Sequence, residues 1–142
     1  MLALFTETAK EVGDGQQYDL DFEKRDDVTE AEYMEMIRLK TSVLLASSLK
    51  LGGILAGATE SDLENLYRYG ETIGLAFQLQ DDLLDVYADE KLFGKKIGGD
   101  ICCNKKTFLL ITAMNLASPA QLAQMKEWME KEEFDAAEKI AW

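Results

Sequence analysis

Apolar residues recur every three or four positions along most of the chain, and strict alternation is nearly absent. This spacing is the period of helices that bury one face, so the sequence predicts helices rather than strands. The expected helices cover about 2–12, 30–51, 62–87, 105–116, 119–131 and 134–141, with a loop over 88–104. The fold class predicted from this pattern is all-α, a bundle of packed helices.

Three short motifs predict where helices begin. Thr29 with Glu32, and Ser61 with Glu64, have the spacing of a capping box, in which each side chain binds a free backbone N–H. The pair Ser118–Pro119 combines an N-cap residue with a proline at the first helical position.

The helix expected over 62–87 carries carboxylates where a buried face should continue. Its apolar stripe consists of Leu63, Leu66, Tyr67, Gly70, Ile73, Gly74 and Phe77. At about 3.6 residues per turn, this stripe next reaches Asp81 and Asp85. Gln78 lies on its flank, and Asp82 lies slightly further round. Carboxylates without partners are not stable in a core, so these aspartates predict a Mg²⁺ site; the alternative is a solvated, acidic helix end.

Two other helices also place polar groups among apolar residues. The face of the second helix is formed by Tyr33, Ile37, Lys40, Leu44 and Leu51. The face of the first is formed by Leu2, Phe5, Ala9, Val12 and Gln16, provided that this helix continues past Gly13 and Gly15. Lys40 alone could reach the rim of the bundle, and Gln16 alone could be a satisfied core amide. With the aspartates, they predict a polar, metal-binding cavity inside the bundle.

Composition narrows the function classes. Acidic residues outnumber basic ones by 27 to 15, and the net charge of −12 argues against binding to a nucleic-acid backbone. The chain has no histidine, which excludes Ser-His and Cys-His catalysis and histidine-ligated metal sites within it. The two cysteines, Cys102 and Cys103, are adjacent, so we expect a reducing compartment and a cytoplasmic location. No segment is long and apolar enough to predict membrane insertion.

One short segment has the opposite charge. The segment Lys91–Lys106 contains five lysines and a single acid, Asp100, and it also contains Gly94, Gly98 and Gly99. A flexible, lysine-rich loop directly after the aspartates predicts an anionic ligand such as a diphosphate, bridged to the carboxylates by metal.

Four motifs in order resemble those of trans-type polyprenyl diphosphate synthases, the family of farnesyl and geranylgeranyl diphosphate synthases. FQLQDDLLD over 77–85 is similar to the family's second aspartate-rich motif, and GKKIGGDICCNKKTFLL over 94–110 to the loop and helix after it. KT at 40–41 and GQQYD at 15–19 are similar to two further motifs. The resemblance extends over roughly 2–113. It implies the all-α isoprenoid synthase fold and a homodimer.

The resemblance also implies a reaction: an allylic diphosphate ionises, isopentenyl diphosphate attacks the carbocation, and a proton is lost. Mg²⁺ and the allylic diphosphate would be bound by Asp81, Asp82 and Asp85. The residues implied in binding substrate are Gln16, Lys96 and Lys105. Those implied near the diphosphate and the carbocation are Lys40, Gln78 and Thr41, with Thr41 at a helix kink.

The chain also departs from the family pattern. Nothing in it matches the family's first aspartate-rich motif or the basic residues that bind isopentenyl diphosphate. The resemblance therefore implies that residues 1–142 are one domain, the C-terminal portion of a synthase without its N-terminal helices and extreme C-terminus. Here the bundle would be partial, and we expect the chain to be inactive alone. The alternatives are a non-catalytic subunit and an acidic helical interaction module.

Overall fold

The computed structural model describes residues 1–88, 94 and 97–141, and within these ranges it contains helices and no strands, which confirms the all-α prediction. The elements are α1 (Leu2–Phe22), α2 (Glu30–Ile37), the π-helix η1 (Arg38–Ser42), α3 (Val43–Leu55), α4 (Glu60–Tyr87), α6 (Gly99–Cys102), α7 (Phe108–Leu116), α8 (Pro119–Glu130) and α9 (Ala136–Ala141). None of the described helices is long and apolar enough to cross a membrane.

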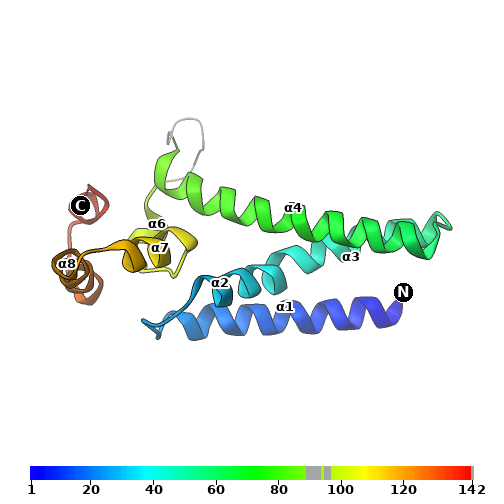
Figure 1. Ribbon diagram of the computed structural model, residues 1–142, viewed down its shortest axis with the longest axis horizontal. Helices are drawn as coiled ribbons and strands as arrows, with labels where there is room; N and C mark the ends of the chain where they lie inside the picture. The colour runs from blue at the N-terminus through cyan, green and yellow to red at the C-terminus, as the bar shows by residue number, and fades with distance from the viewer. Residues whose placement is uncertain (89–93, 95–96, 142) are drawn as a thin grey trace.

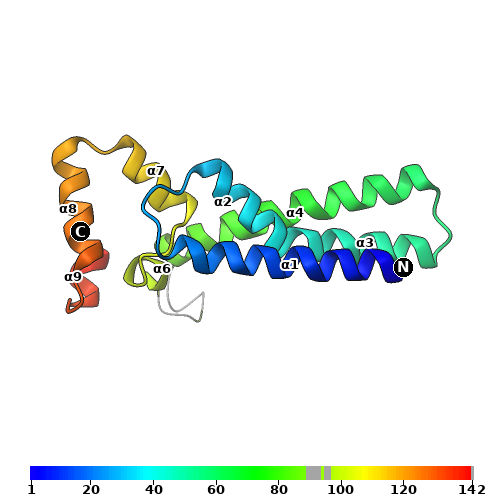
Figure 2. The ribbon, with the colours of Figure 1, turned by 90° about the horizontal axis from the view of Figure 1, so that it is seen from below.

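Three antiparallel rods form most of the molecule (Figure 1). The middle rod, α2–η1–α3, packs against α1 on one side and against α4 on the other. Seen from below, α6 and α7 lie at the end of the rods, and α8 and α9 lie beyond them (Figure 2). The C-terminal ends of α1 and α4 therefore reach the same end of the molecule as the start of α2.

The capping predictions are confirmed at two of three helix starts. Thr29 with Glu32 forms a complete capping box before α2, and Ser118 forms another before α8. The prediction for Ser61 is wrong, because the N-cap of α4 is Thr59, whose hydroxyl accepts the N–H of Asp62. The helix therefore begins one residue before Ser61, which lies in its first turn.

Glycines let the rods approach closely. A Cβ added at Gly74 of α4 would lie 2.5 Å from Cα of Ser42 in η1, and one at Gly70 would lie 2.6 Å from Cα of Ala46. A Cβ at Gly15 of α1 would overlap the backbone N of Lys40. The three glycines thus mark the lines along which α1 and α4 touch the middle rod. Toward the α7 end of the rods, buried side chains form a hydrophobic cluster. It consists of Phe22, Val28, Tyr33, Met36, Ile37 and Ile111.

Helix α1 runs through its glycines to Phe22, but the predicted buried face is wrong. Leu2 and Phe5 are 79% and 64% exposed, and Gln16 is also exposed. The buried residues of this helix are instead Thr8, Gly15 and Phe22. Since contact with the middle rod is made at Gly15, Gln16 projects about 100° away from it.

The glycine contacts supply a prediction about stability. Gly74→Ala should destabilise the fold by about 1–3 kcal/mol, because its methyl group would overlap the backbone of η1. Gly13→Ala, in a helix interior with nothing within 4 Å of the added Cβ, should instead stabilise by about 1 kcal/mol. Urea denaturation of both variants measures the difference. Equal effects at the two positions would contradict the close approach of α4 to η1.

Candidate active site

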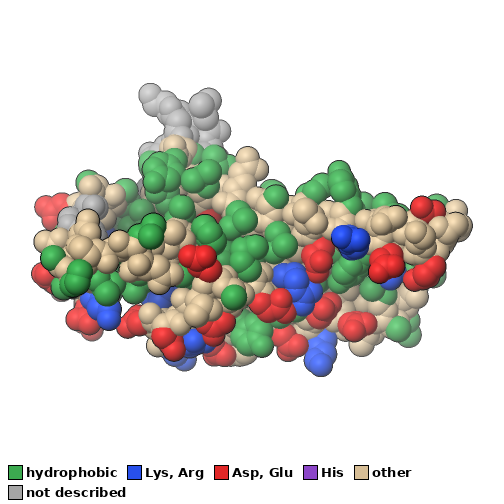
Figure 3. Space-filling view, in the orientation of Figure 1, with side chains coloured by type: hydrophobic (Ala, Val, Ile, Leu, Met, Phe, Trp, Pro, Cys, Tyr) green, Lys and Arg blue, Asp and Glu red, His purple; other side chains and the backbone are tan. Residues whose placement is uncertain are grey.

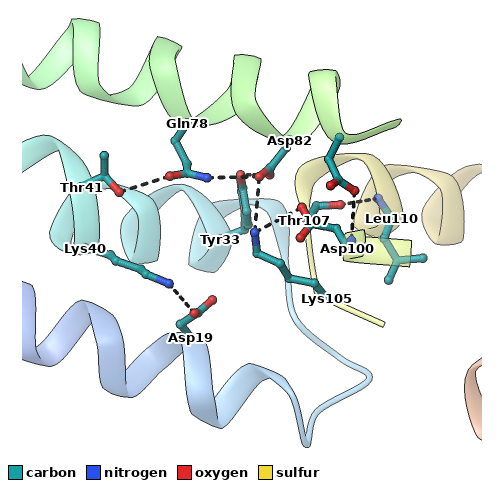
Figure 4. Close-up of polar contacts among 11 residues, drawn as sticks. Asp19, Tyr33, Lys40, Thr41, Gln78, Asp82, Asp100, Lys105, Thr107 and Leu110 are labelled. Carbon is teal, nitrogen blue, oxygen red and sulfur yellow. Dashed lines mark hydrogen bonds and ion pairs between the residues drawn. The ribbon is translucent and has the colours of Figure 1, made fainter. Parts of the chain in front are cut away.

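Polar side chains meet where the rods reach α6 and α7 (Figure 4). They come from α1, from the middle rod, from α4 and from the segment 97–107, which are far apart in the sequence. Nearly all are linked to one another by hydrogen bonds or ion pairs.

Asp82 of α4 is at the centre of this group and is only 2% exposed. The buried hydroxyl of Tyr33 donates a short hydrogen bond to Oδ2 of Asp82. On the other oxygen, Nε2 of Gln78 donates at 3.2 Å and Nζ of Lys105 lies at 3.7 Å. A buried carboxylate without such partners would carry a large desolvation cost, so this arrangement stabilises Asp82 where it lies. The pKa of Tyr33 is raised mainly by burial and, to a smaller extent, by the hydrogen bond to Asp82. The Tyr33 hydroxyl therefore keeps its proton and remains a donor.

The π-helix η1 contributes two of the predicted residues. Thr41 Oγ1 donates to Oε1 of Gln78 at 3.2 Å, which connects the middle rod to Asp82 through the Gln78 amide. Lys40 Nζ donates to Oδ2 of Asp19 in α1 at 2.5 Å, and both side chains are partly buried. The widened turn of a π-helix is often found at functional sites, and here it brings Lys40 and Thr41 toward different neighbouring rods.

Lys105 and Asp100 connect α4 to the segment that follows it. Lys105 Nζ donates to Oδ2 of Asp100 at 3.2 Å, and the backbone N–H of Asp100 donates to Oδ2 of Asp85 at 3.0 Å. Burial lowers the pKa of Lys105, but the carboxylates of Asp100 and Asp82 outweigh it and leave the pKa raised. Burial raises the pKa of Asp100, although Lys105 opposes the shift. Lys105 is therefore held as a cation between two carboxylates.

A pocket of about 180 Å³ lies beside this ion pair. Its lining is mostly charged, with a single aromatic ring, and consists of Asp19, Phe22, Glu23, Asp100, Cys103, Lys105 and Lys106. The side chain of Lys106 is 5% exposed and lies 3.6 Å from Asp26. Both lysines that the structure describes in the basic segment thus reach the pocket.

The three predicted aspartates have different surroundings. Asp82 is buried in the network, whereas Asp81 and Asp85 are half-buried on successive turns of α4. Among the described residues, no three acidic or thiol side chains are grouped so that they could hold a metal ion alone. The three-aspartate metal set therefore stays a prediction, and Lys96 lies outside the described residues.

Three residues that pair with predicted site residues were absent from the sequence-based set: Asp19, Tyr33 and Asp100. Each had a signal in the sequence. Asp19 is the acid of the GQQYD motif, Tyr33 lies on the same helix face as Lys40, and Asp100 is the single acid of the lysine-rich segment. The sequence does not show which residue each of them contacts, because every one of these contacts joins two separate elements.

Comparison with known proteins agrees with this fold. The family model described as Polyprenyl synthetase matches residues 1–142. The chain is 44% identical over 117 residues to the short chain isoprenyl diphosphate synthase of Methanothermobacter thermautotrophicus, covering 82% of this chain and 36% of that protein. A crystal structure of geranylgeranyl pyrophosphate synthase superposes with a TM-score of 0.90 at 45% identity, covering 98% of this chain and 43% of that one.

A further solved relative holds ligands. The polyprenyl synthase from Caulobacter crescentus CB15, complexed with calcium and isoprenyl diphosphate, superposes with a TM-score of 0.87 at 28% identity. The match covers 99% of this chain and 44% of that one.

The all-helical fold and the matching family model define the class: this chain belongs to the polyprenyl synthetase family. It spans about a third of the length of the curated relatives it matches, 36% and 34% of the short chain isoprenyl and Methanosarcina mazei geranylgeranyl diphosphate synthases.

The contact between Tyr33 and Asp82 can be tested through stability. Tyr33→Phe should lower the free energy of unfolding by about 1–3 kcal/mol, because the buried Asp82 carboxylate loses a donor. Tyr18→Phe is the matched control, since Tyr18 is 45% exposed and its change should stay within about 0.5 kcal/mol. Chemical denaturation compares the two; equal losses would show that the Tyr33 hydroxyl does not stabilise Asp82.

Proposed function

We propose that this chain provides half of the diphosphate site of a Mg²⁺-dependent prenyltransferase that condenses isopentenyl diphosphate with an allylic diphosphate. One observation carries the proposal. Lys105, on the segment after α4, reaches back to Asp82 and Asp100, next to the helix turns that carry Asp81 and Asp85. Cationic and anionic groups suited to metal-bridged diphosphate therefore lie together in a chain of this family.

The donor set fits Mg²⁺ bound through one or two carboxylates. This ion usually takes few protein oxygens and completes its coordination with water and substrate phosphate, so a three-carboxylate cage is not required. We narrow the predicted ligands to Asp81 and Asp85, because both are only half-buried, whereas Asp82 is 2% exposed and both of its oxygens face Tyr33, Gln78 and Lys105. When bound, Mg²⁺ would neutralise charge on the leaving diphosphate. The solved relative from Caulobacter crescentus CB15 is complexed with calcium and isoprenyl diphosphate, which supports a divalent cation together with a diphosphate as ligands.

The other residues of the network would act on the substrate directly. Lys105 pairs with Asp82 and Asp100, and Lys40 pairs with Asp19; each lysine would donate to diphosphate oxygens. The backbone carbonyl of Thr41 in the π-helix and the amide of Gln78, which the Thr41 hydroxyl contacts, would face positive charge that develops on the allylic carbon. Lys96 is proposed as a further diphosphate ligand by resemblance alone.

The homodimer is also part of the proposal. Space filling shows hydrophobic side chains at the surface among many acidic ones (Figure 3). Leu2 and Phe5 of α1 form an apolar surface that a partner chain would bury. The cytoplasmic location stays a prediction based on the free thiols of Cys102 and Cys103.

Binding of inorganic diphosphate to the 142-residue chain tests the site without requiring turnover. Calorimetry should detect binding when Mg²⁺ and diphosphate are both present, and little with either alone, because the metal bridges phosphate to carboxylate. Asp81→Asn and Asp85→Asn should each weaken it at least about tenfold.

Glu64→Gln is the matched control, since Glu64 is an exposed carboxylate of the same helix far from its C-terminal end. This variant removes the same charge and should bind as the parent chain does. Binding of diphosphate without Mg²⁺ would contradict a metal bound by these carboxylates. Equal weakening by all three variants would show that the loss of affinity comes from the change in net charge.

A further inference from the structure

Asn104, the residue before Lys105, is held from two directions. Its Nδ2 donates to the carbonyl oxygen of Met129 in α8 at 2.8 Å, and its Oδ1 accepts from Nζ of Lys139 in α9 at 2.7 Å. Among the described residues, Asn104 is the only one besides glycine with a positive φ, at 53°. Asparagine tolerates this left-handed conformation better than most residues and offers both a donor and an acceptor.

Helix α9 contacts the segment at Gly98 and Cys102 as well as at Asn104. Lys139 is 5% exposed, and its Nζ also donates to the carbonyl oxygen of Cys102 at 3.4 Å. The next residue, Ile140, packs onto Gly98, so closely that a Cβ there would overlap it. Gly98 has a φ of 78° and begins the segment, while Asn104 ends it. Helices α8 and α9 thus hold both ends of the segment that carries Asp100.

The position of Lys105 depends on these contacts. Its backbone N–H donates to the carbonyl oxygen of Asp100 at 3.0 Å, and its side chain returns to Asp100 and Asp82. A long lysine side chain loses much rotamer entropy when it is fixed, so its backbone must be well placed for the ion pairs to form.

We propose that Asn104 is a positioning residue, anchored by Lys139 and the Met129 carbonyl, that directs Lys105 into the diphosphate site. The inference rests on the proposed function, because it concerns how that site's lysine is held. It assigns α8 and α9, which contribute no predicted ligand, a role in substrate affinity.

Asn104→Gly is the most direct test, because glycine keeps the left-handed backbone and removes both anchors. In the 142-residue chain, affinity for inorganic diphosphate with Mg²⁺ should fall about tenfold while the helical circular dichroism is kept. In a Lys105→Met background, Asn104→Gly should cause no further loss, since it acts through Lys105. Equal losses in the two backgrounds would overturn the proposal.

A second measurement needs no ligand. Amide hydrogen exchange at residues 98–107 should be faster in Asn104→Gly and in Lys139→Met than in the parent chain. Lys131→Met is the matched control, because Lys131 lies at the end of α8, pairs with Glu127 at 3.9 Å, and has no contact with Asn104 among those the structure describes.

The two measurements separate the possible failures. If the parent chain binds no diphosphate but exchange rises as expected, the proposed function is wrong and the anchoring of the segment stands. If exchange in Asn104→Gly and Lys139→Met matches that of Lys131→Met, the positioning role is wrong, whatever the parent chain binds.

Discussion

A carboxylate in the interior is the constraint on which the site depends. Asp82 is 2% exposed, and it is stable there because Tyr33, Gln78 and Lys105 surround its two oxygens. These partners come from the middle rod, from α4 itself and from the segment before α7. The fold therefore has to bring the middle rod and the segment before α7 to one side chain of α4, and the pocket lies beside the Lys105 of that group.

Close packing of the rods makes this convergence possible. Gly70 and Gly74 allow α4 to lie against the middle rod. The same line of contact extends to Gln78 and Asp82, about one and two turns beyond Gly74. At the other side, α8 and α9 hold the segment that carries Lys105 through Asn104. The electrostatic network is thus supported by backbone contacts on one side and by an asparagine anchor on the other.

Most of the helices could be predicted from periodicity and capping motifs. Polar positions on apolar helix faces indicate Lys40, Gln78 and Asp82, whereas Thr41 and Lys105 are indicated individually only by the resemblance. The face that each helix turns toward its neighbours could not be predicted in this way. Apolar periodicity gives weight to large side chains such as Phe5 and Phe77, which are exposed here, whereas contact between these rods is made by glycine. For this reason the apolar pattern predicts that Gln16 faces the interior and that Asp82 lies beside the buried face, whereas Gln16 is exposed and Asp82 is buried. The partners Tyr33 and Asp100 depend on tertiary contacts, which a local pattern does not contain.

The central claim is that the aspartates of α4 have different roles. Asp82 accepts hydrogen bonds in the buried network, and Asp81 and Asp85 bind the metal ion. Crystals of the chain grown with Mn²⁺ and inorganic diphosphate would test it through anomalous scattering from the manganese. The account predicts a manganese peak beside Asp81 or Asp85, with the hydrogen bond from Tyr33 to Asp82 retained. A manganese ion bound by Asp82, with the Tyr33 hydroxyl released, would contradict it.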